Sequence, residues 1–208
     1  ALNVTVTGTE APGFVSVYPC GSTSDVAPNV SNVNYVAGAA VANSAVVPLE
    51  DGFVCVKAVG ATDVLIAVAG LFLSRHVTVE PGRVVDSRVS GLKVVDVSRF
   101  RVAGARVIGG PRAGELVGVP VDASAVMVNV TVTNPASAGY VSVFACGLAV
   151  PVTSHANFVA GETVANAALV ALGVDGKICV TSSSRLDVIV DVQGWFGPQS
   201  PYQAITPV

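Results

Sequence analysis

The sequence predicts an all-β fold made of antiparallel sandwich or jelly-roll-like repeats that are held by disulfides. The composition is 51% hydrophobic and only 12% charged, with valine and alanine dominant, and β-branched side chains pack well on a pleated sheet. Short stretches alternate between apolar and polar residues, as half-buried strands do. Glycines and prolines separate these stretches at the close spacing typical of sandwiches and barrels. No stretch has the periodicity of a helix.

The clearest strand is expected at residues 128–133, where valines alternate with Asn129, Thr131 and Thr133. A hairpin turn is expected at Asp175-Gly176. The other strands of this part are expected at 141–144, 157–159, 164–172, 178–181 and 186–192. Residues 77–126 are expected to add strands near 83–88, 93–100 and 106–108.

The chain contains two copies of one tandem repeat, residues 1–76 and 127–208. The matched segments keep their order: 3–7 with 129–133, 13–21 with 139–147, 34–38 with 157–161, 41–43 with 164–166, 51–56 with 175–180 and 63–72 with 187–196. Residues 77–126 occur once, as a β segment that links the copies or is shared between them. The first copy is incomplete, because nothing that resembles residues 83–126 precedes it. Ala204–Val208 resembles Thr78–Gly82, the start of the unique segment.

One pair of cysteines lies at matched positions in each copy: Cys20 and Cys55 in the first, Cys146 and Cys179 in the second. Three connectivities are possible, and the repeat favours pairing within each copy. A metal site is the alternative, but there is no C-x-x-C motif, and His76 and His155 are not at equivalent positions. Disulfides are typical of oxidising compartments. We therefore expect an extracellular or cell-surface location.

At the second copy the motifs become specific: N-V-T-V-T-N-P-x-x-x-G-Y-V-S-V-F-x-C-G, N-F-V-A-G-x-T-V-A-N, D-G-x-x-C-V and D-V-I-V-D-V-x-G-W-F. They resemble a repeat of secreted surface proteins of high-GC Gram-positive (actinobacterial-type) bacteria. There a T-P-x-R-x-x-D-T-R element precedes the repeat, and Glu80–Arg88 is similar to it. The resemblance implies an accessory surface module, in tandem or appended to exported enzymes, and no shared activity. The first copy departs from it, with Leu71 and Ala67 where the second has Trp195 and Asp191.

Charge and hydropathy disfavour two partner classes. The net charge is −3, whereas nucleic-acid binding needs basic clusters that displace counterions. The longest apolar stretch, residues 64–73, has about half the length that a bilayer requires. We therefore expect no nucleic acid and no membrane span.

No catalytic constellation is found, so no enzyme is expected. The serines at 182–184 lack a G-x-S-x-G motif, and the absence of a D-x-D-x-D-G loop disfavours calcium; no cofactor or metal is expected. Asp187 and Asp191 share one side of a strand, and we interpret them as structural carboxylates. Arg83, Asp86 and Arg88 could bind an anion, but a structural ion pair is favoured.

Four residues are candidates for ligand binding: Trp195, Tyr202, Asn157 and Asn166. The aromatic pair could stack on a sugar, but core packing is favoured for Trp195 because leucine stands at its place in the first copy. The asparagines recur as Asn34 and Asn43, and asparagine side chains also cap turns and strand ends.

Two functions remain as hypotheses. The first is an extracellular structural protein of the cell surface that self-associates into filaments or layers by subunit packing or strand complementation. Low charge, the repeat and the incomplete first copy favour it, because exposed sheet edges are paired or covered in stable proteins. The alternative is an accessory module that binds carbohydrate, such as cell-wall glycan.

Overall fold

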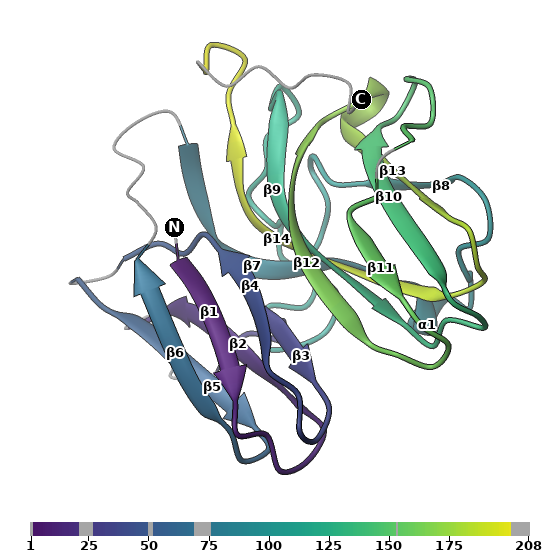
Figure 1. Cartoon of the computed structure of the whole chain (residues 1–208). Coiled ribbons are helices and arrows are strands. Elements are labelled where there is room, and N and C mark those ends of the chain that lie inside the picture. The colour runs from purple at the N-terminus through teal and green to yellow at the C-terminus, as the bar shows by residue number, and fades with distance from the viewer. Residues whose placement is uncertain (1, 21–26, 50–51, 69–75, 153, 201–208) are drawn as a thin grey trace.

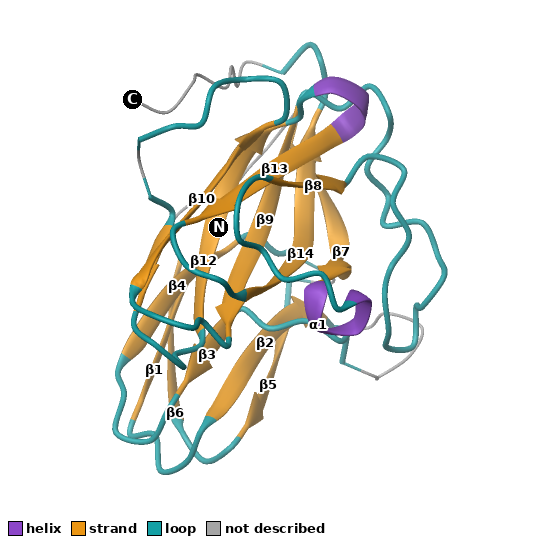
Figure 2. Cartoon of the chain, turned by 90° about the vertical axis from the view of Figure 1, so that its right-hand side faces the viewer, coloured by secondary structure: helices purple, strands orange, loops and turns teal. Residues whose placement is uncertain are grey.

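The computed structural model describes residues 2–20, 27–49, 52–68, 76–152 and 154–200. The all-β prediction is confirmed, because the strands form four antiparallel sheets stapled by two disulfides. Figure 1 shows two lobes, the first coloured purple to blue and the second teal to yellow, and Figure 2 shows how little helix they contain.

The first lobe is a sandwich of two three-stranded sheets, with strand orders β4-β1-β6 and β3-β2-β5. Alternating valines such as Val4, Val6, Val15 and Val17 point inward and form its core. The strand bounds are β1 (Leu2–Thr7), β2 (Gly13–Pro19), β3 (Val33–Tyr35), β4 (Val41–Ala45), β5 (Val54–Val59) and β6 (Asp63–Val68).

The second lobe repeats this arrangement and extends it to two four-stranded sheets, β12-β9-β14-β7 and β11-β10-β13-β8. β9 to β14 occupy the places of β1 to β6, in the order that the sequence repeat predicts. The bounds are β9 (Ala125–Thr133), β10 (Gly139–Ala145), β11 (Ala156–Phe158), β12 (Val164–Ala171), the 3-10 turn η1 (Val174–Gly176), β13 (Lys177–Ser182) and β14 (Asp187–Phe196).

The unique segment supplies the extra strand of each sheet in the second lobe. β7 (His76–Asp86) pairs with β14, and β8 (Ser98–Arg101) pairs with β13. The loops around them add buried valines to the same core, at positions 94, 102, 107, 117 and 119. The sequence left open whether this segment links the two repeats or is shared between them. In the structure both of its strands pair with strands of the second repeat.

Some expected strands of the unique segment are wrong in detail. β7 ends at Asp86, because the Asp86 carboxylate accepts from Arg88 N and caps the short helix α1 (Ser87–Ser90). α1 ends at Gly91, whose φ of 70° suits a residue without a Cβ. Only the end of the expected strand 93–100 is a strand, as part of β8. The expected strand 106–108 is an irregular loop, in which Arg106 makes one isolated bridge with Leu116.

No helix within the described residues has the length and apolarity needed to cross a membrane.

Candidate functional site

The two lobes differ at the side of the sandwich that is formed by β5 and β6. Ile66 pairs with Val4, and Val56 pairs with Val17, so both face the core of the first repeat. Nevertheless Ile66 and Val56 are 40% exposed and Val68 is 72% exposed. Their counterparts in the second repeat, Val190, Val180 and Val192, are 0% exposed. We call this surface of the first repeat, formed by Val56, Ile66 and Val68, the open side.

The difference follows from the unique segment. In the second repeat β7 runs along β14 and β8 along β13, and their loops close the space between the sheets. Among the described residues no strand pairs with the outer edges of β5 and β6. β6 also lacks the lysines and prolines by which natural sheets protect an edge. The open side is therefore an apolar surface with unpaired backbone groups.

The carboxylates of the second repeat are engaged by cations or by polar hydrogen-bond donors. Arg83 donates from Nε to Asp191 Oδ1 at 2.9 Å and from Nη2 to Oδ2 at 3.2 Å. Burial raises the pKa of Asp191, opposed by this guanidinium. Ala67 stands at the place of Asp191 in the first repeat, where no described residue forms a counterpart of β7 and its arginine.

Asp187 accepts from Lys93 Nζ at 2.6 Å, Ser87 Oγ at 3.0 Å and Asn134 Nδ2 at 3.1 Å. Burial would raise the pKa of Asp187, but these hydrogen bonds outweigh burial and lower it. This arrangement agrees with the interpretation of Asp187 as a structural carboxylate.

The Arg88 side chain makes two hydrogen bonds to Asp86, and they lower the pKa of Asp86 and raise that of Arg88. Arg83 Nη1 lies 3.6 Å from the same carboxylate. The expected ion pair is present, and it joins the end of β7 to α1.

The repeats meet through buried asparagines that the sequence did not single out as a contact. Asn43 Nδ2, on β4, donates to Asn129 Oδ1, on β9, at 2.7 Å. Asn129 Nδ2 donates in turn to Ser31 O at 2.5 Å. Val46 N donates to Gln193 Oε1 at 3.2 Å and Ser31 N to Asp191 Oδ2 at 3.3 Å. We call this contact the junction; in Figure 1, β4 of the first lobe faces β12 of the second.

The candidate ligand-binding residues do not gather in one place. Trp195 packs against the core and also lines an open pocket of about 350 Å³ with Val77 and residues 197–200. Asn166 pairs with Val130 of β9, whereas Trp195 pairs with Val126, about 13 Å further along that strand. Asn157 lies exposed on the other sheet. Tyr202 and Leu71 fall outside the described residues.

Asn43 and Asn166, at repeat-matched positions, have matched structural partners. Asn43 Nδ2 donates to Asn32 O, and Asn166 Nδ2 donates to His155 O. His155 stands where the first repeat has Asn32: Val143 N donates to His155 Nδ1 at 3.1 Å, as Val17 N donates to Asn32 Oδ1 at 2.7 Å. Burial lowers the pKa of His155. Capping of the backbone accounts for these side chains.

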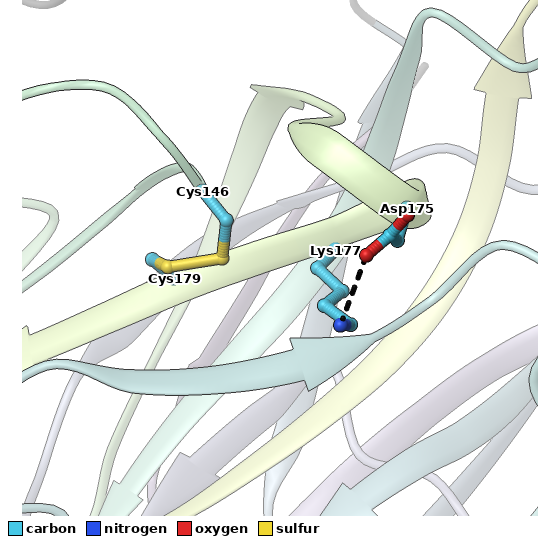
Figure 3. The surroundings of a disulfide bond; sticks show 4 residues. All are labelled: Cys146, Asp175, Lys177 and Cys179. Atoms are coloured by element: carbon cyan, nitrogen blue, oxygen red, sulfur yellow. Dashed lines mark hydrogen bonds and ion pairs between the residues drawn. A yellow bond between two sulfur atoms is a disulfide. The ribbon is translucent and has the colours of Figure 1, made fainter.

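Both disulfides pair as the repeat predicts, Cys20 with Cys55 and Cys146 with Cys179. Each ties two neighbouring strands of one sheet, β2 to β5 and β10 to β13. Figure 3 shows the second, close to the ion pair in which Lys177 Nζ lies 3.4 Å from Asp175 Oδ2. No group of three or more histidines, cysteines and carboxylates within the described residues could hold a metal ion.

Comparison with known proteins gives no family assignment. No protein-family model matches the chain, and neither the curated proteins nor the solved structures contain a significant match.

Proposed function

We propose that this protein is an extracellular structural protein of the cell surface, whose first repeat is completed by a strand segment from a neighbouring subunit. The observation that carries the proposal is the exposure of core-facing Val56, Ile66 and Val68, whose counterparts are fully buried. Contiguous apolar surface of this kind marks an interaction site.

The fitting partner is a segment like residues 76–119, because that segment fills the same space in the second repeat. A strand added to β6 gains backbone hydrogen bonds, and its alternate side chains fill the gap between the sheets. In sequence, the start of such a segment recurs at 204–208, outside the described residues. The extracellular location is supported by the two disulfides and by the resemblance to actinobacterial-type surface repeats.

The test is the assembly state of the full chain with both disulfides intact. Light scattering after size exclusion, with electron microscopy, should show concentration-dependent polymers of the wild type. The double variant Ile66→Asp/Val68→Asp should assemble markedly less than wild type at equal concentration, because it places two carboxylates where the incoming apolar side chains would pack. Val89→Asp, at an exposed position of α1, is the matched control and should assemble like wild type. A wild-type chain that stays monomeric at high concentration contradicts the proposal.

A second candidate function is glycan binding, favoured by the pocket beside Trp195. Indole rings present a flat apolar face, on which a sugar ring can stack. Co-sedimentation with purified cell-wall glycan tests it: wild type should sediment and Trp195→Ala should not. A monomeric protein that binds glycan through Trp195 would favour this function over assembly.

A further inference from the structure

The junction joins two different kinds of surface. The first repeat contributes the side of its sandwich between β3 and β4, with Ser31, Asn32 and Asn43, which we call the edge surface. The second contributes the outer face of its β12-β9-β14-β7 sheet, with Asn129 and Asp191, which we call the face surface. Asn43 is 4% and Asn129 1% exposed, so the contact excludes water from both.

Because the repeats share one fold, each repeat carries an edge surface and a face surface. The junction uses the edge surface of the first repeat and the face surface of the second. The edge surface of the second repeat is free, since Ser154 and Asn166, the counterparts of Ser31 and Asn43, are exposed. The face surface of the first repeat is also free: Asn3, the counterpart of Asn129, is exposed. Leu65 is 55% exposed there, whereas its counterpart Ile189 is 5% exposed.

The free surfaces keep the two asparagines and the serine of the junction's central hydrogen bonds. Asn3 and Asn166 are asparagines like their counterparts, and Ser154 is a serine like Ser31. The free edge surface is also organised in the same way, because Asn166 donates to the carbonyl of His155 as Asn43 does to that of Asn32. The side chain that would reach across is thus already held in place.

The main difference between the two face surfaces is the residue at the position of Asp191. This difference makes the free face surface of the first repeat easier to bury. Asp191 is buried at the junction only with Arg83 beside it. Ala67 takes its place on the first repeat, so a partner that covers this position buries no carboxylate there. A buried unpaired charge would cost more than most contacts recover.

We infer that a second copy of this chain docks head-to-tail, with the edge surface of one second repeat on the face surface of the partner's first repeat. Asn166 Nδ2 then donates to the partner's Asn3, which donates to the carbonyl of Ser154. Two unlike free surfaces on one chain make a head-to-tail contact, which propagates into an open-ended polymer when the rotation between subunits does not close a ring. The inference rests on the proposed function, for which it names the partner. It uses a surface distinct from the open side.

The first experiment measures assembly of charge variants. Asn166→Lys should weaken association by about 30-fold, as expected when a charge is buried without a partner. Asn3→Asp/Asn166→Lys should restore it, because the new charges meet across the interface. Val121→Lys, which adds the same charge to an exposed loop, should have no effect. Polymers that form equally well from Asn166→Lys overturn the docking mode and leave strand complementation at the open side in place.

The second experiment detects docking even without a stable polymer. The four native cysteines are in disulfides, so an introduced cysteine is the reactive thiol. Asn3→Cys mixed with Asn166→Cys should cross-link under mild oxidation at least about tenfold faster than Asn3→Cys mixed with Val121→Cys. Equal rates overturn the inference. A fast cross-link in a chain that scattering finds monomeric supports the docking mode and contradicts stable assembly, so the two failures are distinguishable.

Discussion

The two repeats of this chain share strand order, disulfide position and asparagine caps, but they differ in how far their cores are closed. The second repeat has four strands in each sheet and fully buried valines on β13 and β14. The first has three strands in each sheet and exposes the same positions. One sequence motif thus supports a closed and an open sandwich, and the presence of the segment 76–119 decides between them.

The largest expected difference between the repeats comes from one substitution made at matched positions. Val190→Asp buries a carboxylate in a closed core and should destabilise the second repeat by more than about 4 kcal/mol. Ile66→Asp lies on the open side and should cost about 1 kcal/mol or less in dilute monomer. Urea unfolding followed by circular dichroism measures both. Equal losses would mean that the open side is closed in solution.

The next largest expected difference between the repeats comes from the buried Arg83–Asp191 ion pair, which has Ala67 at its place in the first repeat. Arg83→Ala leaves Asp191 buried without its cation and should cost about 3 kcal/mol or more. Arg83→Met/Asp191→Ala copies the neutral arrangement around Ala67 and should recover most of that loss. The free energy of unfolding in urea is the measurement. A double variant as unstable as Arg83→Ala would show that packing of the arginine stem, and not the unpaired charge, dominates.

Removal of each disulfide should affect the repeats unequally. The loops closed by Cys20–Cys55 and Cys146–Cys179 have similar sequence separations of 35 and 33 residues, so each should contribute about 3 kcal/mol. The first repeat has the smaller core, so Cys20→Ala/Cys55→Ala should unfold it, while Cys146→Ala/Cys179→Ala leaves the second folded. Limited proteolysis and hydrogen exchange would distinguish the outcomes. Resistance of the first repeat after loss of its disulfide would contradict the comparison.

The smallest expected difference concerns pH. Burial lowers the folded-state pKa of His155, so the unfolded chain takes up a proton first as pH falls below about 6.5. The second repeat should therefore keep its full stability above that pH and lose part of it below. His155→Asn, which copies Asn32, should abolish this loss. The carboxylates Asp86 and Asp187 have lowered pKa values, so they weaken the fold only in a separate window, from about pH 4 downward.

The sequence predicts the parts of this structure that depend on local pattern or on the repeat. Alternation at 128–133 places β9, and matched cysteines give both disulfides. The partners of the unique segment are less predictable, since strand pairing is a tertiary property. Polar loops such as 106–108 can carry a few alternating residues without forming a strand. Helix α1 depends on one capping carboxylate, Asp86, which a pattern of hydrophobic residues does not register.

The candidate site was partly accessible from sequence. The incomplete first copy indicates an open sheet edge, and the structure locates it at β5 and β6. The junction was missed because Asn43 and Asn129 lie on different repeats, and only the folded chain brings them together. The signal that could have found them is their recurrence as Asn166 and Asn3, since asparagines kept in both copies need a role in both.

The placement of the disulfides has a mechanical consequence. Cys20–Cys55 and Cys146–Cys179 each cross-link neighbouring strands within a sheet, so a tension applied to the two ends of the chain passes through the sulfur bridge and bypasses the residues between. β3 and β4 lie inside the first of these loops and β11 and β12 inside the second, so these strands carry no tension when the ends of the chain are pulled. Each loop removes on the order of 100 Å from the contour length that the stretched chain can reach. An oxidised chain therefore reaches its limit of extension early and keeps these strands out of the path of force.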